Sequence, residues 1–573
     1  MSSNVASQSG IGRWVPILGW LPKYQRSWLG ADIIAGFTIW GLLIPEMIAY
    51  ADLAGLPPQA GLYTLLATLG LYALFGTSRQ LVVAGTSASA VLVFSAVSDL
   101  AKTSTADYAT LAAGLIVVTG VLFVIAGLLR LGFITQFLSR PVMAGFVFGL
   151  AIFVAVGQLP KLLGIEKGEG NTIRQLGHVI ANLGNVSVTT LVVGVGALAL
   201  LFGVERFAPR IPGGLVVLVL GIATSAVFNL SEHGVAIIGD IPAGLPSVTV
   251  PQLRFEDMWV LLPSAVGMLL VIYSEALGAA STFADKHGYR LDSNQEMIAL
   301  GVANIGSAFL GGLAGGGSLS QTAVNDGAGA RTQVSTLFAA AISLVTVAAL
   351  TPLFHDLPEA VLAALIIHAV LRLMRVREML GFYRLIPREF WLGAITIAGV
   401  VVLDVLPGLV IGVVLSIVLL VGRASRPRVS VLGALPGEKA EYVDLARHPD
   451  AQPLDGFLVV RPDATLFYAN AQAVCDVILD LVDAASSPLR AVVLDLDAND
   501  DIDITSAEHL VKLRQSLERR NVQLRLSHVH APTLQMAHDV GLIDHPRSQD
   551  TFPDIDAAVH WSDPTRSAHD DSG

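Results

Sequence analysis

"GGLAGGGSLSQTAVNDGAGARTQVS", residues 311 to 335, is the stretch that decides the fold, because it interrupts a chain built mainly from long apolar runs. Its three consecutive glycines permit close backbone approach and unusual dihedral angles. They lead into a helix whose first turn supplies Ser318, Leu319, Ser320 and Gln321. Free amide groups and the positive end of a helix dipole would meet at this turn, which suits a bound anion. Small residues that let helices pack closely are the alternative interpretation.

A second segment of the same character lies near residues 84 to 100 and opens with "AGTSASA". Its first turn offers Thr86, Ser87 and Ala88, and like residues 318 to 330 it is too polar to be attractive in lipid. We therefore predict two short, interrupted helices whose N-terminal ends face each other and hold an anion between them. Neither start carries a basic residue, and Arg331 lies too far along the chain to reach the same place.

The composition is that of an integral membrane protein. Of 573 residues, 53% are hydrophobic and 14% are charged, and the mean hydropathy is +0.65. Soluble domains average about 25% charged residues. Besides the two interrupted segments, twelve apolar runs are long enough to cross about 30 Å of hydrocarbon. They lie near residues 31–51, 60–76, 110–129, 139–158, 186–206, 213–230, 259–284, 293–314, 332–351, 356–373, 390–405 and 407–424.

Basic residues support this set of fourteen segments with both termini in the cytoplasm. Of the 24 Lys and Arg residues up to residue 428, nineteen fall on the predicted cytoplasmic side. The other five are Lys102, Lys161, Lys167, Arg174 and Arg254. Positive charge favours the cytoplasmic side, and adding or removing one span would scramble the bias. No removable signal peptide is apparent, so we expect the first span to direct insertion into a plasma membrane, the inner membrane of a bacterium.

The order of the segments predicts an inverted repeat. The interrupted segments are the third and the tenth, and the spans that carry Glu46 and Glu275 are the first and the eighth. Both pairs differ by seven, which is odd, so two halves of seven spans must insert with opposite orientations. Many secondary transporters have this plan and bind their substrate at discontinuous helices.

After residue 428 the chain changes character. Residues 1 to 428 carry 24 basic and 22 acidic side chains, whereas residues 429 to 573 carry 11 and 24. The β-type runs "GFLVVRPD", "LRAVVLDLD" and "VQLRLSHV" alternate there with helix-like segments, which predicts a small α/β domain. We divide the chain into a cytoplasmic N-terminal segment (1–30), a transmembrane transport domain (31–428), a cytoplasmic domain (429–562) and a disordered tail (563–573). The net charge of -13 in the last 145 residues argues against nucleic acid as a partner.

Two carboxylates lie inside predicted spans. Glu275 is more than two turns from either end of its span, so burial disfavours its charged form and it is expected to take a proton or a cation such as Na+. A hydrogen-bonded packing role is its alternative. Glu46 follows Pro45 and could equally satisfy the backbone at a kink. Ser293 and Glu296 have the spacing of a capping box at the start of the ninth span.

The sequence indicates neither an enzyme nor a resident cofactor. Histidines in the membrane part do not pair with Cys or His at ligand spacing, so no metal centre is expected. Cys475, the single cysteine, excludes an intrachain disulfide and is expected to be a buried core residue of the cytoplasmic domain.

Two motifs identify a family resemblance. "PEMIAYADLAGLPPQAGLYTLL" and "NQEMIALGVANIGSAFLGGLAGGGSLSQTAVNDGAGARTQVS" resemble the SulP anion transporters, whose membrane domain is followed by a cytoplasmic STAS domain. The resemblance covers essentially the whole chain. It implies seven plus seven inverted spans, divided into a mobile core and a gate, usually in a homodimer within membrane lipid. It places the substrate site at Glu46, Thr86 to Ala88, Glu275 and Gly317 to Gln321.

The resemblance also shows departures. Many relatives carry glutamine in place of Glu46 and arginine in place of Gln321, so this site has gained a negative charge and lost a positive one. We therefore expect cation-coupled uptake of a small anion such as sulfate, bicarbonate or a dicarboxylate. Alternatives are an uncoupled exchanger or channel, a nucleobase-cation symporter, and a membrane-anchored STAS signalling scaffold. The resemblance aligns Thr505 with a phosphorylatable position of STAS domains, although an ordinary helix cap is the simpler interpretation. It also implies a cytoplasmic protein partner for this domain.

Overall fold

The computed structural model describes residues 14–98, 100–133, 139–168, 170–208, 212–242, 244–252, 254–374, 376–436, 441–544 and 550–561. Packing divides the chain into two compact units, Met1–Ser416 and Ile417–Gly573. The first thirteen residues and the predicted tail, 563–573, lie outside the described residues.

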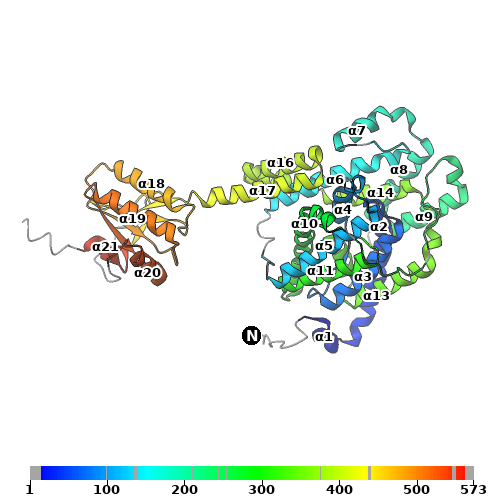
Figure 1. Ribbon diagram of the computed structural model, residues 1–573, viewed down its shortest axis with the longest axis horizontal. Coiled ribbons are helices and arrows are strands. Elements are labelled where there is room, and N and C mark those ends of the chain that lie inside the picture. Colours follow the sequence, from blue (N-terminus) through cyan, green and yellow to red (C-terminus); the bar gives the residue numbers. More distant parts are fainter. Residues whose placement is uncertain are drawn as a thin grey trace, which may run out of the picture. The chain divides into compact units, whose positions relative to one another are not determined.

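Fourteen helical segments of the described chain correspond to the fourteen predicted segments (Figure 1). Their apolar composition makes them helical in lipid, where each backbone donor and acceptor must be satisfied within the protein. They are α2 (Leu29–Leu53), α3 (Pro58–Phe75), α4 (Ser87–Ser98), α5 (Tyr108–Leu128), α6 (Arg140–Leu163), α8 (Val188–Phe207), α9 (Gly213–Phe228), α10 (Phe255–His287), α11 (Ser293–Phe309), α12 (Leu319–Gly327), α13 (Val334–Val345), α14 (Glu359–Leu373), α16 (Pro387–Leu403) and α17 (Val405–Ala424).

Seven stretches of the described chain are long and apolar enough to cross a membrane by length and composition. One of them combines α13 with the π turn Thr346–Leu350 and the 3-10 turn Thr351–Phe354. Three further helices of this unit are α1 (Ile17–Trp20), α7 (Thr172–Ala181) and α15 (Val376–Leu385).

A short two-stranded ribbon joins the two interrupted segments. Strand β1 (Val83–Gly85) leads into α4, and strand β2 (Gly315–Gly317) leads into α12. The strands are antiparallel, with Val83 opposite Gly317 and Gly85 opposite Gly315. The third and tenth segments therefore run in opposite directions, as the inverted repeat requires. Because each helix leaves its strand at the opposite end of the ribbon, α4 and α12 extend away from each other and their N-termini lie close together.

The helices of the first unit form two packing groups. In one group, α2, α3, α4, α5, α10, α11, α12 and α13 contact one another. In the other, α6, α8, α9, α14 and α16 contact one another, and α17 packs on α16 where Gly408 meets Val400. In Figure 1, α6, α8 and α16 lie along the upper side of this unit and α3, α11 and α13 along the lower side. We call these the core group and the gate group; they meet where α2 contacts α9 and α14, and where α4 contacts α6.

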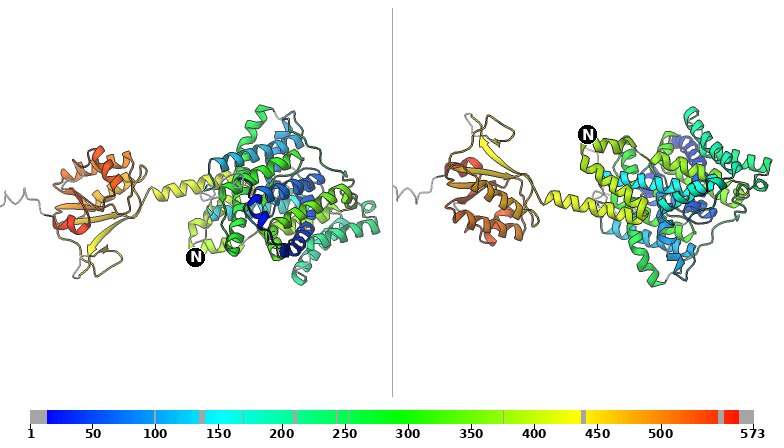
Figure 2. Two further views of the ribbon diagram at one scale, coloured as in Figure 1. Left: turned by 90° about the horizontal axis from the view of Figure 1, so that it is seen from below. Right: turned by 90° about the horizontal axis from the view of Figure 1, so that it is seen from above.

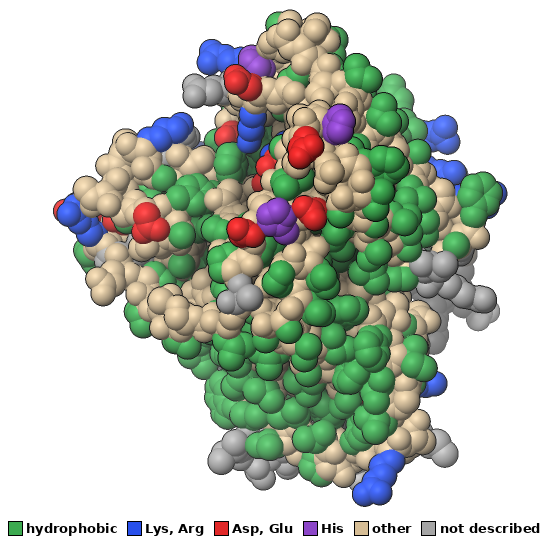
Figure 3. Space-filling view, turned by 90° about the vertical axis from the view of Figure 1, so that its right-hand side faces the viewer, with side chains coloured by type: hydrophobic (Ala, Val, Ile, Leu, Met, Phe, Trp, Pro, Cys, Tyr) green, Lys and Arg blue, Asp and Glu red, His purple; other side chains and the backbone are tan. Residues whose placement is uncertain are grey.

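The surface of the first unit is strongly apolar. Many large hydrophobic side chains are exposed on its helices, among them Val192, Phe202, Phe228, Val410 and Val414. Figure 3 shows one face on which hydrophobic side chains dominate the lower part while acidic and histidine side chains gather higher up. Apolar surface of this extent is suited to lipid rather than water.

The second unit contains a six-stranded mixed sheet of order β4-β3-β5-β6-β7-β8, in which β5, β6, β7 and β8 are parallel. Its strands are β3 (Val429–Ala434), β4 (Tyr442–Asp444), β5 (Phe457–Pro462), β6 (Ala491–Asp495), β7 (Gln523–Ser527) and β8 (Thr551–Phe552). Its helices are α18 (Ala471–Asp483), α19 (Ile504–Glu518), α20 (Ala531–Asp539) and α21 (Ile555–His560). Figure 2 shows helices on both faces of the sheet, and separate hydrophobic clusters fill the two faces.

Candidate functional site

The β1–β2 ribbon sits between two carboxylate-bearing helices. On one side, a side chain added at Gly85 would lie 3.0 Å from the Met47 sulfur of α2. On the other, a Cβ at Gly317 would lie 2.8 Å from Cα and Cβ of Ala276 on α10. Met47 and Ala276 are the sequence neighbours of Glu46 and Glu275, so the ribbon brings both carboxylate positions to one place.

The three glycines serve close approach rather than unusual backbone angles. Of the two uses that glycine permits, the structure shows the first, because residues 315 to 317 form an extended strand without positive φ angles. Besides the contact of Gly317 with α10, a Cβ at Gly315 would lie 2.6 Å from Cγ2 of Thr68 on α3. Glycine is needed because β2 is pressed between helices on both sides.

Buried polar side chains satisfy the broken backbone next to the ribbon. Asn304 of α11 both donates to the Gly315 carbonyl and accepts from the Gly315 amide, each at 2.9 Å. The Ser89 hydroxyl donates to the carbonyl of Ala314 at 2.8 Å, and that of Ser307 donates to the carbonyl of Leu313 at 2.6 Å. Non-helical backbone can persist inside a membrane protein when such partners are supplied.

Both interrupted helices begin with hydroxyl side chains that hold part of the first turn. The Ser89 amide donates to the Thr86 hydroxyl, and the Thr86 amide donates to that of Ser89, both at 3.1 Å. At α12, Ser318 is the N-cap and accepts from the amide of Gln321. The remaining amides of these first turns have no carbonyl of their own helix within reach. The predicted residues Thr86, Ser87 and Ala88 are buried, whereas Leu319 and Ser320 are exposed.

Gln321 and Glu46 bind each other directly. Nε2 of Gln321 donates to Oε2 of Glu46 at 2.8 Å and lies 3.4 Å from the carbonyl oxygen of Gly85. Gln321 is 2% exposed, and its Oε1 has no hydrogen-bond partner among the described residues. One side chain thus ties the first turn of α12 to α2 and to the end of β1.

Glu275 lies at the start of a polar strip on α10. It is partly buried and has no hydrogen-bond or ion-pair partner in the described part of the chain. Toward the C-terminal end of the helix, Gly278, Thr282 and Asp285 are exposed and share a face with it. Exposed small and polar residues at this spacing on a membrane helix indicate a water-filled path rather than a lipid contact.

Two residues of the site escaped the sequence analysis. Tyr50 lies one helical turn after Glu46, is 6% exposed, and its hydroxyl interacts electrostatically with Glu46, Glu275 and Arg372. We counted Arg372, at the end of the predicted span 356–373, only among the charges on the cytoplasmic side; it lies in the last turn of α14, and its charge also acts on Glu46. The periodicity of α2 could have indicated Tyr50, but the position of Arg372 depends on how α14 packs against α2.

Arg372 forms an ion pair within the gate group. Its Nε lies 3.4 Å from Oε1 of Glu205 on α8, and Oε2 of Glu205 lies 2.9 Å from Nε2 of His368. Leu365, two turns before Arg372 on the same helix face, packs near Gly214 together with Pro45. The arginine therefore stands roughly 10 Å along the helix from the level of Pro45, given a rise of 1.5 Å per residue.

The predicted capping box at Ser293 is wrong. Asp292 is the N-cap of α11 and accepts from the amides of Asn294 and Gln295. Glu296 instead points into the core group, where it accepts hydrogen bonds from the Tyr72 hydroxyl at 2.6 Å and from Thr77 and Ser78. The buried carboxylate of Glu296 accepts several hydrogen bonds and so satisfies the donors of the irregular chain before β1. These charge-assisted bonds stabilise the protein more than one capping bond at the end of α11 would.

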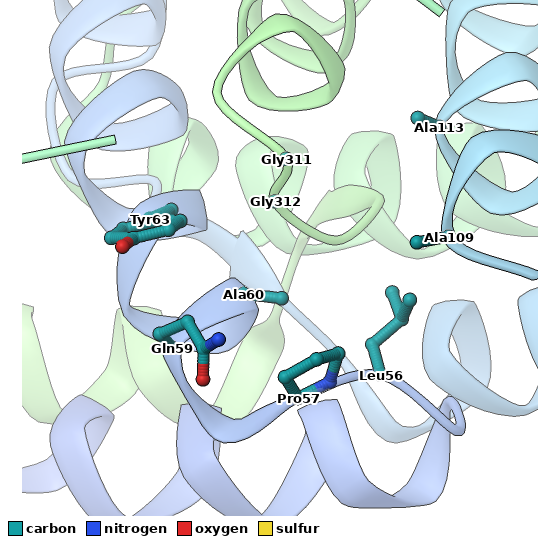
Figure 4. Close-up of a pocket in the computed structure, with 9 residues that line it drawn as sticks. All are labelled: Leu56, Pro57, Gln59, Ala60, Tyr63, Ala109, Ala113, Gly311 and Gly312. Carbon is teal, nitrogen blue, oxygen red and sulfur yellow. The ribbon is translucent and has the colours of Figure 1, made fainter. Parts of the chain in front are cut away.

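A small apolar pocket lies apart from this site. It has a volume of about 150 Å³ and contains no charged side chain (Figure 4). Figure 4 shows it between the start of α3, the start of α5 and the loop before β2. Its lining residues are Leu56, Pro57, Gln59, Ala60, Tyr63, Ala109, Ala113, Gly311 and Gly312.

In the second unit, Thr505 is exposed in the first turn of α19. Asp503 caps this helix by accepting from the amide of Ser506 at 2.9 Å. Cys475 is buried in α18 at 6% exposure, which confirms it as a core residue. Among the described residues, no group of three or more His, Cys, Asp or Glu side chains could hold a metal ion.

Comparisons with known proteins cover nearly the whole chain. A sequence model of the sulfate permease family matches residues 29–396, and one of the STAS domain matches residues 448–558. A probable sulfate transporter of Mycobacterium tuberculosis is 34% identical over 547 residues, covering 95% of this chain and 97% of its own length. The chloroplastic sulfate transporter 4.1 of Arabidopsis thaliana is 31% identical, covering 89% of this chain and 77% of its own.

Solved structures share the fold. Murine SLC26A9, an anion transporter described in its inward-facing state, superposes with a TM-score of 0.85 at 24% identity, covering 98% of this chain and 96% of its own. The transmembrane domain of a cyanobacterial bicarbonate transporter, BicA, superposes with a TM-score of 0.60 at 25% identity, covering 68% of this chain and 98% of its own. With the antiparallel third and tenth segments and the mixed sheet that follows in the chain, these matches show that the chain belongs to the sulfate permease family of anion transporters and carries a C-terminal STAS domain.

Proposed function

We propose that this protein takes up a small anion together with a proton or a sodium ion by alternating access. Sulfate is the first candidate, because the relatives above are named sulfate transporters. Bicarbonate and dicarboxylates are further candidates, because backbone amides can donate hydrogen bonds to any of these anions. Membership in the sulfate permease family decides against a nucleobase-cation symporter of the same architecture.

The observation that carries the proposal is the meeting of two helix N-termini at one ribbon. We assign the anion to the space between the first turn of α4 (Thr86 to Ala88) and that of α12 (Gly317 to Gln321), beside Glu46. Main-chain amides and helix dipoles stabilise a bound anion there without a salt bridge. The exposed side chain of Ser320 and the partly exposed side chain of Ser318 make this space reachable along the polar face of α10.

We assign the coupling role to Glu275. It lies on that polar face, one residue from the contact between Ala276 and Gly317, and is unpaired in the described part of the chain. An ionised carboxylate at this place would repel the anion and has no partner to offset its burial. Binding of a proton or Na+ removes that repulsion, so entry of the anion and of the cation become linked.

We further propose that both termini are cytoplasmic, that the protein resides in a plasma membrane and that it works as a homodimer. The positive-inside bias supports this orientation. The face where α2 and α6 end and α14 begins is then the outer face, and the polar strip of α10 leads to the cytoplasm. A cytoplasmic protein that binds the STAS domain, with Thr505 as a modification site, is compatible with the exposure of α19.

Uptake into liposomes tests the function. Purified full-length protein is reconstituted and supplied with labelled sulfate, bicarbonate, fumarate or succinate under an imposed proton gradient, a sodium gradient or neither. We expect one of these anions to accumulate only when a cation gradient is present. If uptake is the same with and without a cation gradient but requires an anion inside the liposomes, the protein is an exchanger. Uptake of none of the four would favour a signalling scaffold in which the STAS domain is the functional part.

A further inference from the structure

An ion pair on the outer face joins the core group to the gate group. Nζ of Lys161, in the last turns of α6, lies 2.5 Å from Oδ1 of Asp52, in the last turn of α2. The same ammonium lies 3.2 Å from Oε2 of Glu359, the first residue of α14. Lys161 and Glu359 belong to the gate group, so the contact with Asp52 crosses between the groups and the contact with Glu359 does not.

This ion pair has the surroundings of a specific contact rather than of a loose surface pair. The side chains of Lys161, Asp52 and Glu359 are 30%, 26% and 36% exposed, so each is more covered than exposed. One cation placed between two carboxylates is bound by both. The gate-side carboxylate Glu359 keeps Lys161 at the boundary, where it can reach Asp52.

Asp52 itself is held firmly by the core group. The turn after α2 is fixed by the Tyr108 hydroxyl of α5, which donates to the carbonyl of Ala54 at 2.6 Å. The next residue, Gly55, has a φ of +71° and packs against Tyr108 and Phe94. Movement of the core group would therefore carry Asp52 with it and pull it away from Lys161.

A second contact crosses the same boundary close by. Nζ of Lys167, which follows α6, lies 4.8 Å from the ring centroid of Phe94 on α4. A cation over an aromatic face is an attractive contact that depends on geometry. Lys161 of α6 and Lys167 shortly after it thus contact α2 and α4 of the core group.

These contacts close the outer side of the site while the other side stays open. Asp52 follows Glu46 by six residues, about 9 Å along α2 at 1.5 Å per residue. Between them, Ala49 and Ala51 are at most 1% exposed. In the opposite direction, Gly278 and Thr282 of α10 are exposed, so the structure is open on the side that leads away from Lys161.

We propose that Lys161 and Asp52 form an outer latch, which holds the transporter closed to the outside and must break in each cycle for the site to face outward. This role rests on the alternating access proposed above. Glu359 positions the lysine but does not cross the boundary, so it offers a matched control within the same cluster.

Cross-linking tests the latch directly. In a Cys475→Ser background, D52C/K161C is joined by a short bifunctional methanethiosulfonate reagent, and K161C/E359C is treated in the same way. We expect the core-to-gate cross-link to stop uptake and a reducing agent to restore it, whereas the cross-link within the gate group leaves uptake in place. Undiminished uptake by cross-linked D52C/K161C would overturn the proposal.

A labelling experiment removes the dependence on transport. Ala49→Cys, in the same background, is exposed from outside to a membrane-impermeant maleimide with no anion or gradient present. Loss of a partly exposed ion pair in Asp52→Asn is expected to raise the labelling rate about two- to fivefold. Glu359→Gln keeps the contact between Lys161 and Asp52, so it is expected to raise the rate less than Asp52→Asn does. An equal rate in Asp52→Asn and the parent would refute the latch even if the protein transports, and a raised rate would support it even if none of the tested anions is carried.

Discussion

The amide of Gln321 donates to the carboxylate of Glu46 at 2.8 Å, across 275 residues of sequence. This bond joins the first turn of α12 to α2 at the place where the ribbon ends. It also gives a reason for a glutamine beside this carboxylate, since a glutamine amide can donate a hydrogen bond to a carboxylate without adding charge.

Replacing Gln321 by methionine removes the donor at similar size. Glu46 would then face the anion site with an unpaired charge, so we expect KM for the transported anion to rise about tenfold, within the cost of stranding one hydrogen-bond partner. Initial rates of uptake against anion concentration measure this. Adding Glu46→Gln to Gln321→Met should recover much of the loss, because the repelling charge is gone. If the double variant is as impaired as the sum of both single variants, the two residues do not act as a pair.

Arg372 supplies positive charge to the site from the gate group. Its charge acts on both Glu46 and Tyr50. Because water is partly excluded from the site, this positive charge also attracts the bound anion, so Arg372→Gln should raise KM for the anion about three- to tenfold. Arg384→Gln is the control, because Arg384 is an exposed residue of the neighbouring helix α15. Introducing Gln321→Arg into the Arg372→Gln protein should restore affinity. An unchanged KM in Arg372→Gln would show that Arg372 does not contribute to anion binding.

The glycines of β2 are expected to tolerate no side chain. In Gly317→Ala, the new methyl group would lie 2.8 Å from two atoms of Ala276, so α10 and the ribbon must separate. We expect a loss of about 1–3 kcal/mol in stability, typical of overpacking, and a larger loss of uptake. Gly327→Ala at the end of α12 meets no atom within 4 Å and serves as the control. Thermal unfolding in detergent and uptake are measured on both. Normal activity of Gly317→Ala would show that the contact with α10 is dispensable.

Cys475 is expected to be chemically inert. Burial raises the pKa of its thiol to about 12, with a smaller contribution from Asp476. The reactive thiolate therefore appears only as pH rises toward 12, and at pH 7.5 the folded protein should react with N-ethylmaleimide at least about a hundredfold more slowly than a free thiol. Gln515→Cys, at an exposed position of α19, provides the accessible comparison in Cys475→Ser protein. Rapid labelling of Cys475 without denaturant would show that α18 does not bury it.

Much of the fold could be predicted because hydropathy and helix length act locally. The first span was expected at 31–51 and α2 covers Leu29–Leu53; the eighth was expected at 259–284 and α10 covers Phe255–His287. The core strands β5, β6 and β7 were found for the same reason. The edge strands β4 and β8 were missed, because segments of three and two residues carry too little alternation to be recognised.

The parts that could not be predicted depend on contacts between distant segments. That residues 315 to 317 form a strand follows from their pairing with Val83–Gly85, which no local pattern contains. Glu296 has the spacing of a cap, but the donors that draw it inward lie more than 200 residues away. Lys161 and Arg372 entered the sequence analysis only as charges on the outer and the cytoplasmic side, because their partners Asp52 and Glu205 are set by how distant helices pack.

The most direct test of the central claim compares Glu275→Gln with Glu46→Gln in proteoliposomes under a proton or sodium gradient. The account predicts that Glu275→Gln still exchanges or equilibrates the anion but no longer accumulates it above the external concentration, because the neutral side chain cannot carry a charge across. Glu46→Gln should keep gradient-driven accumulation, since glutamine at this position can still pair with Gln321. Undiminished accumulation by Glu275→Gln would contradict the assignment of coupling to this residue.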